Sequence, residues 1–304
     1  MAKQKKNARE LHGILVVDKG EGMSSNQLLQ RVKYLYRARK AGHTGTLDPM
    51  ATGVMVLCFG RATKISEHLL GVDKAYRVRC QLGQTTETGD REGTIIETKP
   101  VLAEHRQRIA ETLARFTGDI EQIPPMFSAL KQKGVPLYKL ARQGKQVERA
   151  ARKLKIHELS LLEQQDDELE LYVRCSKGTY IRTLVEDIGA ALGCGAHASA
   201  LRRVEVGDYS IEAAYSLDEL EVLAEKGPQY LDTLLTPIES ALVHYPAVKL
   251  QTGLIELASR GRLVRLDHEP DTPFVRIYDS GRVFHGLGSV QTDGRVKLKN
   301  LHIA

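Results

Sequence analysis

The sequence of 304 residues has no long hydrophobic run and few cysteines. No apolar segment approaches the roughly 20 residues that a membrane-spanning helix needs, and the start, MAKQKKNARE, lacks the apolar core of a signal peptide. We therefore expect a soluble cytoplasmic protein that binds no membrane. The cysteines are widely separated and form no C-x-x-C pair, which argues against a zinc ribbon or a disulfide framework. We expect reduced, mostly buried thiols at Cys58, Cys80, Cys175 and Cys194.

The sequence also lacks the glycine-rich motifs that bind nucleotide phosphates. Neither G-x-x-x-x-G-K-[ST] nor G-x-G-x-x-G occurs, and Gly144-Lys145 is followed by Gln146. The segment GHTGTLDPMATG, residues 42–53, is nevertheless rich in residues that break helices and strands. We interpret it as a surface loop between two regular elements. Motif chemistry alone makes its carboxylate, Asp48, a turn-forming residue before Pro49, although such loops also often hold catalytic groups.

Positive charge is in moderate excess and unevenly distributed. The formal net charge is +6, which favours an anionic partner without requiring one. Between residues 139 and 155 the only acidic residue is Glu148, whereas the basic residues are Lys139, Arg142, Lys145, Arg149, Arg152, Lys153 and Lys155. Such a stretch is usually a solvated face, but it would also follow a phosphate backbone.

Hydrophobic periodicity predicts strands and helices in an irregular order. We expect strands at residues 13–19, 54–59, 76–82 and 168–180, and apolar and polar positions alternate over 76–82 and 169–175. We expect helices from Ser24, with the capping-box pair Ser24 and Gln27, and over 62–70, 102–116 and 179–193. Mixed elements without a steady βαβ rhythm favour an α+β domain around one large, mainly antiparallel sheet.

The chain divides into regions by composition. Residues 1–10 form a basic tail, residues 11–244 the main domain with a basic insertion at about 124–152, and residues 245–304 a small all-β module with repeated turn-then-strand patterns.

Six segments in order give the sequence a specific resemblance. They are GILVVDKGEGMSSN, AGHTGTLDPMATG, GRATKISEHLL, DKAYRVRCQLGQTTETGDREG, IPPMFSALKQKGVPLYKLARQG and CSKGTYIRTLVEDIGAALGCGAHASALRR. Together they resemble the bacterial tRNA pseudouridine-55 synthases, the TruB family. The resemblance implies the pseudouridine synthase fold, a mixed sheet flanked by helices, with a PUA-like RNA-binding β-barrel at the C-terminus. It also implies a monomer that binds the T arm and acceptor end of tRNA, and isomerises one T-loop uridine to pseudouridine without cofactor or metal.

The resemblance assigns catalytic roles to three residues. Asp48 matches the nucleophile of the family, since a carboxylate can form and release a covalent bond to the nucleoside. Arg182 matches the arginine that keeps this aspartate ionised, and Tyr76 the tyrosine that stacks on the flipped base and takes the C5 proton. Without the resemblance we would interpret Arg182 as a solvated helix residue and Tyr76 as an ordinary core aromatic.

Substrate binding is assigned in the same way. His43 matches a residue that fills the gap left by the flipped base, and Tyr180 and Leu201 match walls of the base pocket. Further binding residues are Lys19, Lys131, Lys145 and Arg149. The usual K-P-x-G of the family is Lys19-Gly20-Glu21-Gly22 here, which predicts a looser turn.

Two other functions fit parts of the same pattern. The protein could be a tRNA-folding chaperone that needs only to open the T arm, or a synthase of the same fold that acts on ribosomal or guide-associated RNA. The compact chain without long basic tails argues against the second.

Overall fold

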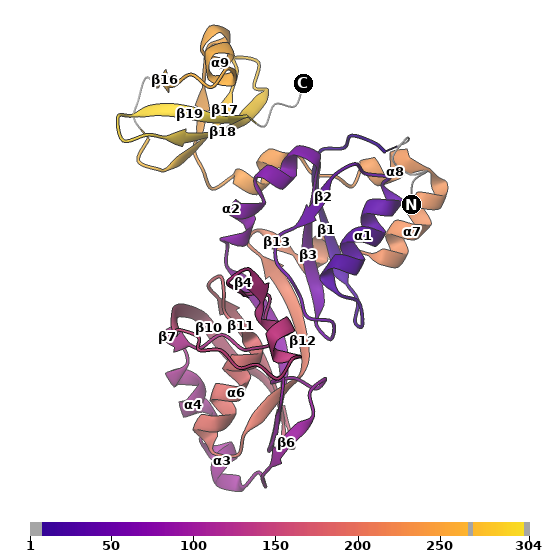
Figure 1. The fold of residues 1–304 in the computed structure, drawn as a ribbon, viewed down its shortest axis with the longest axis vertical. Helices are drawn as coiled ribbons and strands as arrows, with labels where there is room; N and C mark the ends of the chain where they lie inside the picture. Colours follow the sequence, from indigo (N-terminus) through magenta and orange to yellow (C-terminus); the bar gives the residue numbers. More distant parts are fainter. Residues whose placement is uncertain (1–7, 267–269, 301–304) are drawn as a thin grey trace.

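The computed structural model describes residues 8–266 and 270–300, so most of the predicted N-terminal tail lies outside it. In the described part, ten strands form one large mixed sheet (Figure 1). Eight of them follow the order β14 (Tyr215–Ser216), β1 (Gly13–Lys19), β3 (Thr52–Phe59), β12 (Ala196–Val206), β4 (Lys74–Leu82), β11 (Glu168–Cys175), β10 (Arg152–Gln165) and β7 (Gly118–Gln122). The two others pair at its side, β2 (Ala41–His43) with β3 and β13 (Tyr209–Ser210) with β12. Among the described strand pairs of this sheet, only β1–β14 and β3–β12 are parallel, so the sheet is mainly antiparallel, as predicted.

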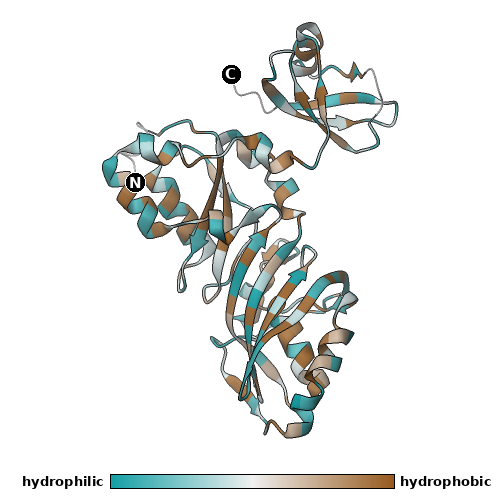
Figure 2. Ribbon diagram, turned by 180° about the vertical axis from the view of Figure 1, so that it is seen from behind, coloured by the Kyte–Doolittle hydropathy of each residue, from teal (hydrophilic) through white to brown (hydrophobic). Residues whose placement is uncertain are grey.

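Helices cover the large sheet in two groups, one at each end of it (Figure 1). The first group contains α1 (Ser25–Leu35), α7 (Leu217–Lys226) and α8 (Pro228–Asp232), and the second α3 (Ala103–Gln107), α4 (Ile109–Arg115) and α6 (Ile181–Leu192). The strands alternate hydrophobic and hydrophilic residues (Figure 2), and the inward residues of β4 and β11 join both helix groups in one core cluster. Arg77 and Arg79 on the other face of β4 are exposed, as the alternation predicted.

The opposite face of β1 and β3 has its own cover. It packs against the 3-10 helix η2 (Gly60–Lys64), α2 (Ser66–Leu70) and the 3-10 helix η4 (Ile238–Leu242). Phe284 and Leu287 of the C-terminal sheet join this cluster, and Lys299 bonds Glu67 at 2.8 Å. Because apolar and charged contacts connect them, the C-terminal sheet lies beside α2 (Figure 1).

The C-terminal sheet has its own small core. Its strand order is β15 (Ala247–Lys249), β17 (Phe274–Tyr278), β18 (Phe284–Val290), β19 (Arg295–Asn300) and β16 (Val264–Arg265), with α9 (Thr252–Ser259) packed against it. Together with the large helix-flanked sheet, this confirms the predicted α+β class with an additional C-terminal β module, but α9 shows that the module is not all-β as predicted. The predicted domain boundaries themselves stay a prediction.

Most predicted elements are confirmed, and three differ in detail. Ser24 caps α1 in a complete capping box with Gln27, and the four cysteines are buried and free. The predicted helix over 102–116 breaks at Arg108 into α3 and α4, and that over 62–70 is part 3-10 helix. The loop predicted at 42–53 is shorter, because its glycine-rich ends join β2 and β3.

The remaining elements lie in the connections. A short hairpin, β5 (Gln84–Thr86) with β6 (Ile95–Thr98), follows β4. The insertion between β7 and β10 contains β8 (Lys131–Gln132), β9 (Val135–Pro136) and α5 (Leu137–Ala141). The 3-10 helix η3 (Ile211–Ala213) joins β13 to β14. Among the residues described, no helix is both long and apolar enough to cross a membrane.

Candidate active site

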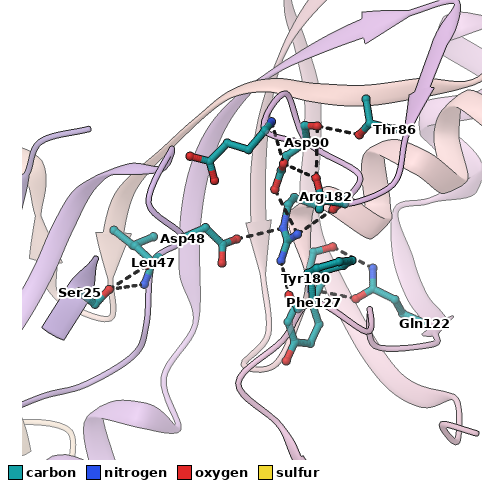
Figure 3. Close-up of polar contacts among 11 residues, drawn as sticks. Ser25, Leu47, Asp48, Thr86, Asp90, Gln122, Phe127, Tyr180 and Arg182 are labelled. Carbon is teal, nitrogen blue, oxygen red and sulfur yellow. Dashed lines mark hydrogen bonds and ion pairs between the residues drawn. The ribbon is translucent and has the colours of Figure 1, made fainter. Parts of the chain in front are cut away.

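The loop between β2 and β3, residues 44–51, is tied to its surroundings on both sides of Asp48. At the start of α1, the buried Ser25 hydroxyl donates to the Leu47 carbonyl at 2.9 Å and accepts from the Leu47 N–H at 2.7 Å (Figure 3). The Pro49 carbonyl accepts from the Lys19 ammonium at 3.1 Å and from the Gly22 N–H at 2.9 Å. Backbone atoms on either side of Asp48 are therefore fixed, and the carboxylate is held in one place.

Lys19, predicted to bind substrate, is fully buried instead of exposed. Its ammonium also donates to the Gly20 carbonyl at 2.9 Å, at the position where the family has proline. Burial lowers the pKa of Lys19 to about 8, and the negative charge of Asp48 is the strongest opposing influence. In this structure Lys19 supports the Asp48 loop.

Arg182 is the centre of the polar network around Asp48. Its Nε lies 3.0 Å from Asp48 Oδ2 and its Nη1 3.1 Å from Asp90 Oδ2 (Figure 3). Nη1 and Nη2 donate to the carbonyls of Thr88 and Phe127, each at 2.7 Å. The Arg182 side chain is 5% exposed, whereas that of Asp48 is 37% exposed. The buried Arg182 guanidinium thus holds an Asp48 carboxylate that is accessible to solvent. Arg182 is therefore not the solvated helix residue that its sequence context suggests.

Asp90 is a second carboxylate of the site that the sequence analysis missed. It is 3% exposed; its Oδ1 accepts from the Thr88 hydroxyl at 2.5 Å and from the Glu92 N–H at 3.1 Å. Residue 90 also forms an isolated bridge to Ala198 of β12. The only sequence signal was the position of Asp90 in the segment GQTTETGDREG, where it reads as one more turn residue.

Burial raises the pKa of Asp48 above that of a free aspartate, while Arg182 lowers it, Asp90 raises it further and Lys19 lowers it. Removal from water disfavours the charged form, and the two neighbouring cations favour it. The site therefore keeps a carboxylate partly out of water, which makes it more basic and less solvated than a surface aspartate.

Tyr76 and Arg203 are paired residues on neighbouring strands of the large sheet. In the middle strand, β12, Arg203 pairs with Gly53 of β3 on one side and with Tyr76 of β4 on the other. Arg203 is 2% exposed and donates to the Val54 carbonyl at 2.8 Å. This register brings Tyr76 close to the end of the Asp48 loop. Sequence reasoning did not identify Arg203.

The Tyr76 side chain is a neutral phenol in this setting. Burial raises its pKa, Arg203 lowers it, and the charge of Asp48 raises it further. A neutral phenol can stack on a base, but it must first lose its own proton before it can take one from carbon. Leu201, which lies on β12 like Arg203, belongs to the same apolar cluster as Tyr76 of β4.

Tyr180, predicted as a wall of the base pocket, and His43, predicted to fill the gap left by the flipped base, are both half-buried. Tyr180 precedes α6, and its N–H and carbonyl bond the Gln122 side chain at 2.8 and 3.1 Å (Figure 3). Burial raises the pKa of Tyr180, and among the weaker influences is the charge of Asp48. His43, on β2, has a shielded Nδ1 without a partner among the described residues. Burial and Arg203 lower its pKa, so its imidazole is neutral, which suits packing against a base.

The basic residues predicted to bind RNA lie in the insertion, and none of them bonds Arg182 or Asp48 within the described residues. Lys131, on β8, and Lys145 are exposed. Arg149 is half-buried, and its Nη1 donates to the Pro124 carbonyl at 3.0 Å. Thus Lys131 and Lys145 are accessible to a ligand, whereas Arg149 already supports the base of the insertion.

Family models match nearly the whole chain. Residues 33–181 match the TruB family pseudouridylate synthase N-terminal domain, 182–243 the tRNA pseudouridylate synthase B C-terminal domain, and 246–301 the C-terminal domain of pseudouridine synthase II TruB. The chain belongs to the TruB family of pseudouridylate synthases. This confirms the resemblance drawn from the six segments, and with it the predicted enzyme class.

Curated relatives of the TruB family align from end to end. Proteins named tRNA pseudouridine synthase B from Nitrosococcus oceani and Pseudomonas aeruginosa are each 49% identical over 302 residues. These alignments cover 99% of this chain and 98% and 99% of the relatives. One from Coxiella burnetii is 47% identical and covers 96% of this chain and 95% of the relative.

Solved structures share the fold at lower identity. A chain in a Cbf5-Nop10-Gar1 complex has a TM-score of 0.74 at 24% identity, covering 98% of this chain and 87% of its own length. A chain in an H/ACA RNP bound to a substrate RNA containing 2'-deoxyuridine has a TM-score of 0.73 at 22% identity, covering 96% and 86%. These neighbours confirm the predicted fold, including the PUA-like C-terminal module.

Proposed function

We propose that this TruB-family protein converts uridine 55 in the T loop of tRNA to pseudouridine, acting as a cytoplasmic monomer with Asp48 as the nucleophile. The observation that carries the proposal is the accessible Asp48 carboxylate held 3.0 Å from the buried Arg182. End-to-end identity of about half with proteins named tRNA pseudouridine synthase B supports tRNA as the substrate.

The geometry suggests a division of roles during the reaction. The target uridine leaves its stack, which costs a few kcal/mol, and His43 occupies the space it vacates. Tyr76 stacks on the base, which is worth roughly 1–3 kcal/mol, and Leu201 and Tyr180 close the pocket around it. Asp48 forms a transient covalent bond to the nucleoside while the N1–C1′ bond breaks. C1′ of the ribose is then joined to C5 while the bond to Asp48 is released, and the proton lost from C5 is balanced by one gained at N1.

Binding of the remaining tRNA is proposed to use two further regions. Lys131 and Lys145 of the insertion contact phosphates of the T arm, because both are exposed and cationic. The C-terminal module, residues 245–304 in the proposed division, contacts the acceptor end.

The decisive experiment is mass-spectrometric mapping of pseudouridine in tRNA after incubation with purified wild type or Asp48→Asn. We expect wild type to modify position 55, and Asp48→Asn to bind the tRNA with unchanged affinity but to form no product. Asp166→Asn is a matched control, since Asp166 lies in the hairpin between β10 and β11 at φ 49°, which asparagine tolerates. Full turnover by Asp48→Asn, or modification elsewhere, would refute the proposal.

A tRNA-folding chaperone role can accompany the reaction, because flipping a base already requires opening of the T-arm contacts. The accessible cations of the insertion support this second role. If chaperone activity dominates in the cell, Asp48→Asn will restore the growth of a deletion strain as well as wild type does. If Asp48→Asn does not restore growth, pseudouridine formation is the activity that the cell requires.

A further inference from the structure

A cavity of about 470 Å³ adjoins the Arg182 network. Thr88 and Phe127 line this cavity, and their carbonyls are the ones to which the Arg182 guanidinium donates. The Nε of the same guanidinium faces Asp48. One planar group therefore separates the reactive carboxylate from a second hollow.

The walls of the cavity differ in chemistry. The insertion supplies an apolar side made of Ile123, Pro125, Met126 and Phe127, and a polar rim made of Lys145, Gln146 and Arg149. An aromatic ring and a methionine form a surface on which a nucleobase can stack. The cations of the rim suit the phosphate beside such a base.

Glu186 projects into this cavity from α6, one helical turn after Arg182. Its carboxyl group packs on Gly89, where an added Cβ would lie 2.7 Å from the carboxyl carbon. Among residues 8–266 and 270–300, neither carboxyl oxygen has a hydrogen-bond or ion-pair partner. Burial raises the pKa of Glu186 to about 7, against the influence of Arg182. A half-buried carboxyl group is therefore available to a ligand.

Thr183 adds a second unused polar group. It lies three residues before Glu186, on the same face of α6, and it also lines the cavity. Its hydroxyl oxygen is shielded from solvent and has no partner within the described chain. A buried polar group without a partner costs about 1–3 kcal/mol, so a ligand that supplies the missing bond gains that contribution.

We propose that this cavity binds the nucleobase next to the target uridine, and that this base carries an exocyclic amino group that donates to Glu186. The inference rests on the proposed function, since it needs an RNA strand whose target base reaches Asp48. A carboxylate oxygen accepts from an exocyclic amine such as N4 of cytosine, and a threonine hydroxyl bonds either donors or acceptors of a base. Because only one guanidinium lies between the two sites, the second base is an immediate neighbour in the strand.

The test is a double-mutant cycle between the protein and the RNA. T-arm stem–loops are prepared with the amino-bearing neighbour of the target replaced by its analogue without that group: 2-pyrimidinone riboside for cytidine, inosine for guanosine, or purine riboside for adenosine. For wild type we expect loss of the amino group to lower kcat/KM about tenfold. For Glu186→Ala we expect the same replacement to change kcat/KM less than about twofold, because the acceptor is already gone.

Asp187→Ala is the matched control, since Asp187 adjoins Glu186 on α6 but does not line the cavity. It should keep the tenfold dependence on the amino group. If Glu186→Ala does not fold, Glu186→Met, of similar length and without an acceptor, replaces it in the cycle. An amino effect that persists unchanged in the Glu186 variant, or that is missing in wild type at both neighbours, overturns the proposal.

The cycle is repeated with dissociation constants in the Asp48→Asn background, where binding is measured without turnover. If wild type forms no pseudouridine in these RNAs, the proposed function fails. The binding cycle then still decides whether Glu186 recognises the amino group.

Discussion

The Asp48 loop and the basic insertion are both irregular segments of the same domain, but they are held in opposite ways. In residues 44–51, the backbone on each side of Asp48 is bonded by Ser25, Lys19 or Gly22, and the carboxylate itself by Arg182. In the insertion, exposed lysines lie on the short hairpin of β8 and β9, whose strands have two residues each, and on the short helix α5. The segment proposed to perform chemistry is fixed from several directions, whereas the segment proposed to bind RNA is anchored mainly at its base.

This difference suits the roles proposed for the two regions. A nucleophile displaced by a fraction of an ångström loses much of its effect, so its loop needs many restraints. Phosphate contacts depend on charge at short range and tolerate movement. We therefore expect substitutions near Asp48 to act on rate or stability, and those in the insertion to act on affinity.

The largest contrast in stability should come from two glycines in left-handed conformations. Gly53, where β3 begins, has φ 105°, and an added Cβ would lie 2.1 Å from the Arg203 carbonyl oxygen. Gly144, in the insertion, has φ 70° and open space around it. We expect Gly53→Ala to lower the free energy of unfolding by more than about 4 kcal/mol, and Gly144→Ala by about 1–2 kcal/mol from backbone strain alone. Urea unfolding measures both, and equal losses would remove the contrast.

Arg182→Lys should have the next largest effect, on rate. Lysine keeps the charge, but its single ammonium group cannot replace the planar guanidinium that bonds Asp48, Asp90 and two carbonyls at the same time. We expect kcat to fall by about 10²- to 10³-fold, the range seen when an organised donor is removed from an active site. Single-turnover pseudouridine formation measures this. Arg77→Lys, on the exposed face of β4, is the control and should keep wild-type kcat; a wild-type rate in Arg182→Lys would show that the fork is dispensable.

The sequence predicted the elements of this comparison better than their connections. Alternation in β4 and β11 and the capping box of α1 identify those elements because the signal is local. The sequence did not predict that β12 would lie between β3 and β4, nor that β14 would join the sheet in parallel, since strand order depends on contacts distant in the sequence.

The candidate site shows the same limit at the level of residues. Asp48 and Arg182 are 134 positions apart, and only the resemblance to the TruB family associated them before the structure was known. Asp90 and Arg203 were missed because each looks like an ordinary surface charge in its own segment; burial by other strands gives them their partners. Lys19 stays a predicted substrate-binding residue; in the structure it is buried and its ammonium donates to the Pro49 carbonyl, a contact that the sequence did not indicate.

The pH dependence of the rate should show a smaller effect, which concerns the Asp48 loop. In the proposed mechanism Asp48 acts ionised, and burial raises its pKa, so the rate should decline as the pH falls through that raised pKa, about tenfold for each further unit. The decline should therefore begin at a higher pH than for an ordinary aspartate. Lys19→Met removes a cation that lowers the Asp48 pKa and should move the acid limb to still higher pH. Lys74→Met is the control, because Lys74 is also buried with a pKa of about 8 but Asp48 is not among the charges that act on it. An equal shift of the acid limb in both variants would show that Lys19 has no specific effect on the pKa of Asp48.

The smallest expected effect concerns the exposed cations of the insertion. The double substitution Lys131→Gln and Lys145→Gln removes two accessible charges that make no hydrogen bond or ion pair within the described residues, so the free energy of unfolding should change by less than about 0.5 kcal/mol. If both lysines contact phosphates, the slope of the logarithm of the tRNA association constant against the logarithm of the salt concentration should flatten by about 0.7–0.9 for each lysine. The tRNA affinity should fall at moderate salt, while kcat at saturating tRNA stays constant. Fluorescence anisotropy over a series of salt concentrations measures the slope, with Lys226→Gln, at the end of α7 on the other helix group, as the control. An unchanged slope would assign these lysines to solvent and leave the insertion without the role that its charge suggests.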